Sequence, residues 1–352
     1  MTQGELFFVE SKPKFPATRY QGSKLKYLDW IWHSIENLNF DTALDAFAGT
    51  GSVSYLLKEK GKSVTCNDIL KFNQIIGKAL IENSDTRLEP SDVELILTKK
   101  ADVEYPNFIA TTFKDTYYTD KENEWLDIVI TNISTLKCPY KKALAQFALF
   151  QSCIIKRPYN LFHRKNLYIR TQDVPRSFGN KATWDTEFEV HFRNFVKEAN
   201  QAVFSNNKKN ISTNHDAMNI KDKYDLIYID TPYISSQGVG VDYYDFYHFL
   251  EGIVNYDTWN EKIDYKSKNK KLIKSESRWT SRNDIAKSFD ELFYKFKNSI
   301  LVISYRSDGI PSIEEIKTLL YKYKTNVQIV RSNSMKYALS TKQSQEVLLI
   351  AK

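Results

Sequence analysis

The amino-acid sequence predicts an α/β protein built on a mostly parallel sheet, and two observations indicate it. Short apolar runs alternate with stretches of helical spacing near both ends of the chain, as a doubly wound sheet requires. Hydrophobic residues make up 42% of the 352 residues, which suffices for a buried core. The alternation stops over residues 86–204, so residues 1–85 and 205–352 are expected to form one domain that an insertion interrupts.

The first unit of this alternation ends in a glycine turn. An apolar strand at 42–45 leads to Gly49 and Gly51, a helix follows over 52–60, and the next strand delivers Asp68. Glycines at such a turn let backbone N–H groups approach a ligand, and an acid about 20 residues later is where ribose hydroxyls bind. The third glycine of the dinucleotide pattern is absent, which favours a nucleoside over a pyrophosphate.

The remaining elements follow from spacing and from capping residues. Apolar residues at helical intervals predict helices over 28–38, 71–83, 139–156 and 283–297. Ser312 with Glu315 predicts a capping box that opens one more helix. Strands are expected over 225–229 and 299–304, and a final antiparallel pair over 326–331 and 345–350.

The strand at 225–229 runs into Asp230, Thr231, Pro232 and Tyr233, a set that suits the amino group of a flat heterocycle. The exocyclic nitrogen of adenine is a poor nucleophile because its lone pair is delocalised into the ring. A carboxylate and a carbonyl that each accept one amino hydrogen draw this nitrogen toward tetrahedral geometry. Pro232 holds the Thr231 carbonyl extended, and Tyr233 can stack on the base while its hydroxyl stays in water. An ordinary turn after a strand is the competing interpretation.

Four segments in one order resemble the Dam-like alpha group of adenine-specific DNA methyltransferases. They are Arg19-Tyr20-Gln21-Gly22-Ser23-Lys24, Asp45-Ala46-Phe47-Ala48-Gly49-Thr50-Gly51, Asn214-His215-Asp216-Ala217-Met218 and Asp230-Thr231-Pro232-Tyr233. The resemblance covers nearly the whole chain. It departs from the family pattern at Thr231, where the family usually has proline.

The resemblance implies a Rossmann-like class I methyltransferase sheet with a C-terminal antiparallel hairpin, S-adenosyl-L-methionine as the cofactor and no metal. The residues that it assigns to the cofactor are Tyr20, Gly22, Lys24, Asp45, Phe47, Gly49, Gly51, Asp68 and Asp216. The catalytic residues that it implies are Asp230, Thr231, Pro232 and Tyr233. A restriction endonuclease is the biological partner that the resemblance suggests.

The insertion is expected to read double-stranded DNA. Cations and aromatic rings interleave over 157–170 and again over 176–184, and the chain carries a formal charge of +7. Cations neutralise phosphates, and rings can fill the gap that a flipped base leaves. The side chains expected to contact DNA are Arg164, Lys165, Arg170, Arg176 and Lys181. A second basic run at 266–274 suits either a solvated loop or the rim of a DNA channel.

Other features narrow the class of protein. The three cysteines form no C-x-x-C pair, so neither a zinc site nor a disulfide framework is expected. No apolar stretch approaches membrane-spanning length, which favours a cytoplasmic protein. His248 lies in an aromatic helix, where a lone histidine is more often structural than a catalytic base.

These observations lead to one hypothesis, methyl transfer to the exocyclic amine of a flipped adenine in duplex DNA, and leave two alternatives open. In the first alternative the amine belongs to cytosine or to an adenine in RNA. In the second the chain is an inactive, cofactor-binding DNA-recognition subunit, with Thr231 as the mark of its lost activity.

Overall fold

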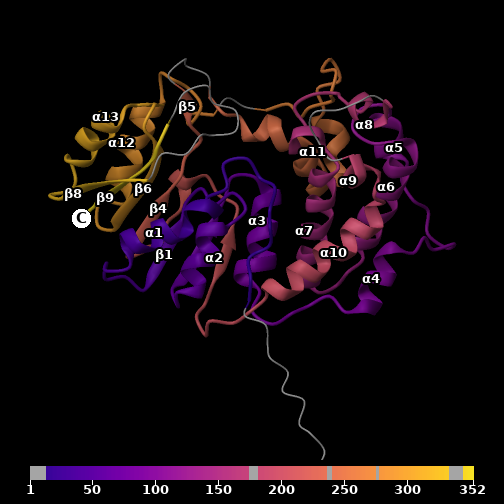
Figure 1. Cartoon of the computed structure of the whole chain (residues 1–352), viewed down its shortest axis with the longest axis horizontal. Helices are drawn as coiled ribbons and strands as arrows, with labels where there is room; N and C mark the ends of the chain where they lie inside the picture. The colour runs from indigo at the N-terminus through magenta and orange to yellow at the C-terminus, as the bar shows by residue number, and fades with distance from the viewer. Residues whose placement is uncertain (1–12, 174–180, 236–239, 275–276, 333–343) are drawn as a thin grey trace, which may run out of the picture.

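A seven-stranded sheet runs through the computed structural model, which describes residues 13–173, 181–235, 240–274, 277–332 and 344–352 (Figure 1). In sheet order the strands are β3 (Ile211–Thr213), β2 (Ser63–Asn67), β1 (Thr42–Asp45), β4 (Leu226–Ile229), β6 (Ile300–Arg306), β9 (Glu346–Ala351) and β8 (Val327–Arg331). The first five pair in parallel, whereas β9 runs antiparallel to both β6 and β8. The predicted parallel sheet with a C-terminal antiparallel pair is confirmed.

Both faces of this sheet are covered by helices. On one face lie α1 (Leu28–Ile35), α2 (Ser52–Glu59) and α3 (Lys71–Gly77), and on the other α12 (Ile285–Lys295) and α13 (Ile313–Leu320). Along β4, Leu226 and Tyr228 join the first core, and Ile227 and Ile229 join the second. Burial on both sides explains why this strand reads as a continuous apolar run.

The order of the strands reverses between β1 and β4, and this reversal positions the site. From β1 the chain proceeds outward through β2 and β3, whereas β4 and β6 extend the sheet on the other side. The two central strands are in register from Ala43 with Leu226 to Asp45 with Tyr228, and the Ala46 N–H donates to the Tyr228 carbonyl over 3.0 Å. The glycine turn and Asp230 therefore leave the sheet side by side, at the kind of crevice where α/β proteins bind ligands.

A helical body flanks the sheet. Its helices are α4 (Pro90–Leu97), α5 (Phe108–Thr112), α6 (Asp120–Ser134), α7 (Pro139–Ile155), η3 (Pro158–Asn160), α8 (Tyr168–Thr171), α9 (Lys181–Asp185) and α10 (Phe188–Ala202). Its apolar core continues that of the sheet domain, because Phe72 on α3 makes an edge contact with Phe150 on α7. None of the helices in the described ranges combines the length and apolar character needed to cross a membrane.

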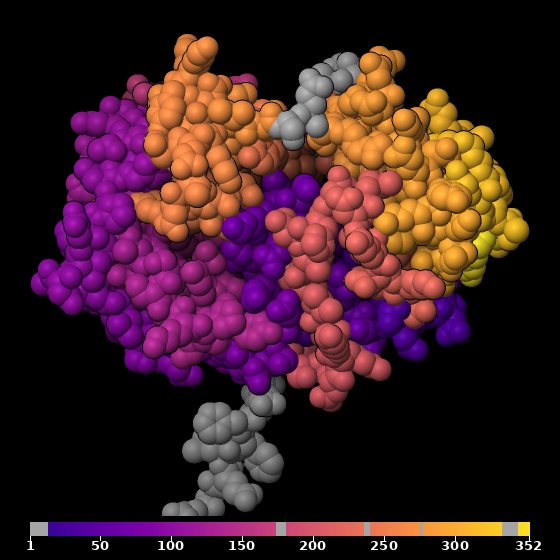
Figure 2. Space-filling model, turned by 180° about the vertical axis from the view of Figure 1, so that it is seen from behind, coloured from indigo at the N-terminus to yellow at the C-terminus, as the bar shows by residue number. Residues whose placement is uncertain are grey.

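Residues 243–272, which follow β4 in the chain, also belong to the helical body. They contain α11 (Tyr243–Val254) and η5 (Tyr256–Lys262). The Trp259 ring packs on Phe108 and Phe113, and His248 Nε2 lies 2.7 Å from the Tyr117 hydroxyl. Figure 2 shows the orange surface of this segment resting on the purple helical surface, with a hollow between it and the C-terminal part of the chain. The insertion predicted from the sequence ended at residue 204 and did not include this second stretch.

Most elements of the sheet domain agree with the sequence pattern, whereas the 15-residue helices α6 and α10 of the helical body were not among the predicted helices. The Ser312 and Glu315 capping box is present at the start of α13. The helix expected over 71–83 changes at Gly77 into the π-helical turn η2 (Lys78–Glu82). The short helices η1 (Leu25–Tyr27) and η4 (Ala217–Asn219), the edge strand β3 and the small pair β5 (Ile234–Ser235) with β7 (Gly309–Ile310) were not expected. They are too short to carry a periodic signal.

The packing of α11 on η5 generates a stability prediction. A Cβ atom added at Gly252 would lie 1.9 Å from Cε2 of the buried Trp259 ring. Gly252→Ala is therefore expected to lower the free energy of unfolding by about 1–3 kcal/mol, measured by urea denaturation. In a Trp259→Leu background the same alanine should cost nothing further, because the clashing ring is gone. Unchanged stability of Gly252→Ala alone would contradict this packing.

Candidate active site

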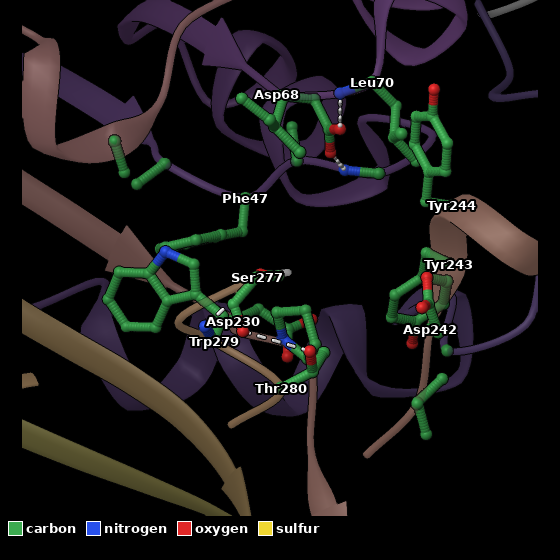
Figure 3. Close-up of a pocket in the computed structure, with 18 of the residues that line it drawn as sticks. Phe47, Asp68, Leu70, Asp230, Asp242, Tyr243, Tyr244, Ser277, Trp279 and Thr280 are labelled. Atoms are coloured by element: carbon green, nitrogen blue, oxygen red, sulfur yellow. Dashed lines mark hydrogen bonds between the residues drawn. The ribbon is translucent and has the colours of Figure 1, made fainter. Parts of the chain in front are cut away.

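A cavity of about 1140 Å³ opens at the carboxyl ends of β1, β2, β3 and β4 (Figure 3). Among the residues that line it are Tyr20, Gly22, Lys24, Asp45, Phe47, Gly49, Asp68, Asp216, Asp230 and Pro232. Gly51, Thr231 and Tyr233, which were expected there too, are not among its lining residues. A pocket for one small molecule typically measures roughly 300–1,000 Å³, so this cavity has room for more than one ligand.

The glycine turn is fastened to the end of β2 by Asp68. One Asp68 carboxylate oxygen accepts the Gly49 N–H and the other accepts the Leu70 N–H, each over 2.8 Å. Burial raises the pKa of Asp68 to about 6, although these two N–H groups oppose the rise. Gly51 lies behind the turn with φ +78°, a conformation that favours glycine, and it shapes the turn without lining the cavity.

Asp45 ends β1 with one satisfied and one unsatisfied oxygen. Its Oδ2 accepts both the N–H and the hydroxyl of Ser54, whereas its buried Oδ1 has no hydrogen-bond partner among the described residues. Burial raises the pKa of Asp45 to about 7, Ser54 opposes the rise, and the nearby Asp230 adds to it. A buried acceptor at the wall of a cavity suits a cationic or hydrogen-bond-donating ligand.

The N-terminal motif lies between the glycine turn and α11. The Tyr20 ring stacks on Tyr247 at a centroid distance of 4.5 Å and on Tyr243 at 5.5 Å. Gly22 has φ +84°, and a Cβ atom there would lie 2.3 Å from the Tyr243 hydroxyl. A Cβ atom at Gly49 would lie 3.2 Å from the Tyr20 ring. The close fit on both sides explains why glycine stands at both positions.

Lys24 contacts the motif from Asp230 to Tyr233 directly. Its Nζ atom lies 3.0 Å from Asp230 Oδ1 and 3.1 Å from Glu346 Oε1, and it also donates to the Tyr233 hydroxyl. The Tyr233 hydroxyl in turn lies 2.7 Å from Asp230 Oδ1 and 3.0 Å from Glu346 Oε1. Burial raises the pKa of Asp230 to about 6, Lys24 opposes the rise, and Glu346 adds to it. We call Lys24, Asp230, Tyr233 and Glu346 the buried charge cluster.

The structure changes two expectations about the motif from Asp230 to Tyr233. Tyr233 is 6% exposed and its hydroxyl is part of the cluster, so the tyrosine does not keep its hydroxyl in water. Thr231 is also buried, and its hydroxyl finds no hydrogen-bond partner in the described part of the chain. Of the four residues in this motif, Asp230 and Pro232 line the cavity.

Glu346 and several aromatic residues were missed by sequence reasoning. Glu346 opens the apolar strand β9 and is fully buried, so a lone acid in an apolar run was its signal. In Figure 3, Phe47 and Trp279 lie on one side of the cavity and Tyr243 and Tyr244 on the other. Trp279 meets the Phe47 ring edge to face at 4.9 Å. The aromatic start of α11 was visible in the sequence, but nothing in it indicated that α11 reaches the glycine turn.

Asp216 and His248 occupy different surroundings. The Asp216 carboxylate accepts the Met218 N–H over 2.9 Å and caps η4, beside the cavity. His248 is fully buried in the helical body, and burial lowers its pKa to about 3. A neutral imidazole away from the cavity agrees with the structural role expected for His248.

The residues expected to contact DNA differ in exposure. Arg164 and Lys165 are exposed, and Lys181 is half-exposed with an ion pair to Asp185 at 2.8 Å. Arg170 is 6% exposed and binds Glu122 at 2.6 Å together with the Tyr117 and Trp184 carbonyls. Its guanidinium therefore stabilises the helical body from within and is not positioned to bind DNA phosphates. Arg176 lies outside the described residues.

A buried arginine supports the exposed basic loop. The Arg157 guanidinium donates to the carbonyls of Tyr117, Leu161 and Arg164 and to the Asn166 side chain. These bonds fix the backbone that carries Arg164 and Lys165, so the two cations project from a rigid support.

Comparisons with known proteins identify the family of this chain. Residues 20–319 match the model of the D12 class of N6 adenine-specific DNA methyltransferases. The type II methyltransferase M2.HphI of Haemophilus parahaemolyticus is 27% identical over 345 residues, which are 96% of each chain. M.NlaIII of Neisseria lactamica is 21% identical, covering 86% of this chain and 88% of the relative. M.FokI of Planomicrobium okeanokoites is 26% identical over 86% of this chain, which spans 46% of that longer relative.

The family match covers the glycine turn, the helical body and the Asp230 motif together. Its residue range includes the cavity lining from Tyr20 to Ser281. The chain belongs to the D12 class of N6 adenine-specific DNA methyltransferases, and its reaction is the site-specific methylation of adenine in DNA.

Proposed function

We propose that the methyl group comes from S-adenosylmethionine and passes directly to N6 of an adenine flipped out of duplex DNA into the cavity. The observation that carries this proposal is the position of Asp230, whose carboxylate borders the same cavity as the glycine turn at Gly49. Flipping is needed because a base inside the duplex cannot reach an enclosed site. Direct transfer needs the acceptor and the methyl donor side by side, and adjacent strand ends provide that arrangement.

The donors and acceptors at one end of the cavity fit S-adenosylmethionine. Asp45 Oδ1 and Ser23 Oγ are buried, belong to lining residues and lack hydrogen-bond partners in the described ranges, so they suit the ammonium and carboxylate of its amino-acid part. Asp68 has lone pairs left for a ribose hydroxyl, and Asp216 and Phe47 border the space for its adenine ring. When bound, this cofactor supplies an electrophilic methyl group on a sulfonium sulfur.

The Asp230 carboxylate would orient the acceptor amine together with the backbone carbonyl of Thr231, which stands between the two lining residues Asp230 and Pro232. Each accepts one amino hydrogen, which frees the nitrogen lone pair for attack. Pro232 keeps the Thr231 carbonyl extended. Because Tyr233 is held in the buried charge cluster, the rings available to stack on the flipped adenine are those that line the cavity, among them Tyr243, Tyr244 and Trp279.

The helical body is proposed to hold the DNA. Arg164 and Lys165 on the loop supported by Arg157 and the half-exposed Lys181 can neutralise phosphates. Lys274 borders the cavity as well, but it is paired with Asp242 and Asp245, which weakens the case for a DNA contact there. Residues 86–204 and 243–272 together form this body, so both stretches contribute to target recognition in our proposal.

A restriction endonuclease of the same sequence specificity is the biological partner that we propose. The relatives M2.HphI, M.FokI and M.NlaIII are named type II methyltransferases, and a further relative is named modification methylase StsI. A methyl group on adenine N6 projects into the major groove, where a nuclease reads that same amino group. Methylation by this chain would thus protect DNA from such a nuclease.

Removal of the Asp230 carboxylate tests the catalytic assignment. Asp230→Asn is expected to lower kcat by about 10²–10³-fold, because the amine loses its anionic acceptor. Transfer of tritiated methyl groups measures the rate, and digestion of the DNA to nucleosides identifies N6-methyladenine. Asp290→Asn changes a partly exposed carboxylate on α12 that pairs with Lys322 and does not line the cavity, and it serves as the control. Wild-type activity of Asp230→Asn would overturn the mechanism.

The glycine turn predicts a separate effect on the cofactor. Gly49→Val places a branched side chain at φ +53° and against Tyr20, so S-adenosylmethionine binding measured by calorimetry should be lost. Gly61→Val is the matched control, since Gly61 also has positive φ but has open space around it and lies away from the cavity. That control should lose stability and keep cofactor affinity. Equal affinities of the two variants for S-adenosylmethionine would contradict the assignment of Gly49 to the cofactor site.

The raised pKa values of Asp230 and Asp45 predict two separate losses as the pH falls, one of the methylation rate and one of cofactor affinity. Protonated Asp230 donates a hydrogen bond where acceptance is required, so kcat/KM for DNA should fall about tenfold per pH unit below pH about 6. Asp45 is protonated as the pH falls through about 7, so cofactor affinity should weaken over that higher range. Calorimetry across pH separates the second effect, and Asp45→Asn should abolish it. A rate that stays level down to pH 5 would contradict the Asp230 assignment.

A further inference from the structure

Lys24 is shared by two buried carboxylates from distant parts of the chain. Asp230 follows β4 and Glu346 begins β9, yet each lies within 3.1 Å of the same ammonium group. Glu346 has no exposed surface, and Lys24 is 5% exposed. With both acids ionised the cluster carries one net negative charge beside the cavity.

Glu346 is held by a residue of β6 and by residues that follow β8 and β4. Its Oε1 atom accepts the Ser304 hydroxyl of β6 over 2.6 Å, and its N–H donates to the Ser332 hydroxyl over 3.1 Å. The Tyr233 hydroxyl also reaches it. A buried carboxylate with this many donors has one position, so it can define the position of the lysine that it binds.

The hydrogens in the cluster leave one Asp230 oxygen for the substrate. Lys24 has three N–H groups, and its three acceptors are Asp230 Oδ1, Glu346 Oε1 and the Tyr233 hydroxyl. The single Tyr233 hydrogen goes to one of the two acids. All of these contacts reach Asp230 at Oδ1, and no described residue donates a hydrogen bond to Oδ2.

We propose that Glu346 is a positioning residue for adenine methylation: it shares Lys24 with Asp230, so that Asp230 turns Oδ2 to the amine and keeps its negative character. This inference rests on the proposed role of Asp230. Without Glu346 the whole charge of Lys24 would neutralise Asp230, and a neutralised carboxylate is a weaker hydrogen-bond acceptor.

The net negative charge matters because the acceptor nitrogen becomes cationic. The lone pair of the acceptor nitrogen forms the new N–C bond. The C–S bond to the methyl group breaks at the same time, and the electron pair of the C–S bond stays on sulfur. The nitrogen then carries one hydrogen too many and releases it as a proton, which Oδ2 can take. A cluster with one excess negative charge stabilises the positive charge in that transition state more than a neutral cluster does.

The groups around Asp230 support an effect of Glu346 on its ionisation. Lys24, Tyr233 and Glu346 touch it, and Asp45 on β1, Tyr228 on β4 and Tyr243 on α11 lie within its electrostatic reach. Of these, Lys24 and Tyr233 lower the pKa of Asp230 and Glu346 raises it. Loss of the Glu346 charge should therefore shift the pKa of Asp230 downward.

Glu346→Gln tests the proposal in the full-length enzyme with duplex substrate DNA. We expect kcat to fall on the order of tenfold and the acid limb of the rate to move down by about one pH unit. KM for DNA and affinity for S-adenosylmethionine should stay within about twofold, since neither ligand touches Glu346. Glu251→Gln is the matched control, because Glu251 is a buried carboxylate that caps α3 outside the cavity.

A double variant guards against a mere loss of folding. Lys24→Gln with Glu346→Gln removes one charge of each sign, so the cluster keeps its net charge of minus one. The pH below which the rate of the double variant falls should return close to the wild-type value. Lys24 lines the cavity, so the comparison uses this pH and not the absolute rate. An acid limb of the rate that moves equally in Glu346→Gln and in the double variant would overturn the proposal.

The outcomes separate this inference from the catalytic assignment. Wild-type kcat in Glu346→Gln, or a lower kcat with an unmoved acid limb, rejects the positioning role of Glu346 while Asp230 retains its own. Full activity of Asp230→Asn instead rejects the proposed function and the inference with it.

Discussion

The hydrogen bond from the Ala46 N–H to the Tyr228 carbonyl ties the end of β1 to the end of β4, and the active site depends on this junction. Neighbouring strands lie about 4.8 Å apart, so whatever follows each of them starts within one ligand's width of the other. Burial raises the pKa of Asp45 to about 7, and the field of the nearby Asp230 adds to that rise. Lys24 offsets the charge of Asp230 at this junction, because its Nζ atom lies 3.0 Å from Asp230 Oδ1.

Local pattern and motif order were sufficient to predict the sheet, the glycine turn and the cavity wall at Asp230. Alternation and capping depend on residues within one turn or one strand, so spacing reveals them. Trp279 reaches the cavity, and Glu346 reaches the buried charge cluster, from segments far along the chain. No periodic signal in the sequence encodes either approach. Arg170 shows the opposite error. Its basic and aromatic neighbours suggested a surface that binds phosphate, but Glu122 and two carbonyls enclose its guanidinium inside the helical body.

Thr231 has a physical meaning beyond its departure from the family pattern. A buried hydroxyl that lacks a partner costs roughly 1–3 kcal/mol of stability, whereas proline at that position has no hydroxyl to satisfy. Natural sequences break local rules mainly at functional sites, where geometry outweighs stability. The proposed chemistry uses the backbone carbonyl of Thr231 and not its side chain. Threonine in place of proline therefore leaves the proposed hydrogen-bond acceptor in place.

Helix α11 belongs to both halves of the molecule. At Tyr243 and Tyr247 it packs on the N-terminal motif above the glycine turn, and from His248 onward it is buried in the helical body. Its backbone leaves helical geometry at Tyr247, between these two environments. Any displacement of the helical body on DNA would therefore act on Tyr20, which packs on α11 and lines the cavity proposed for the cofactor. Thermodynamic linkage makes such coupling reciprocal: whatever factor DNA adds to cofactor affinity, the cofactor adds to DNA affinity.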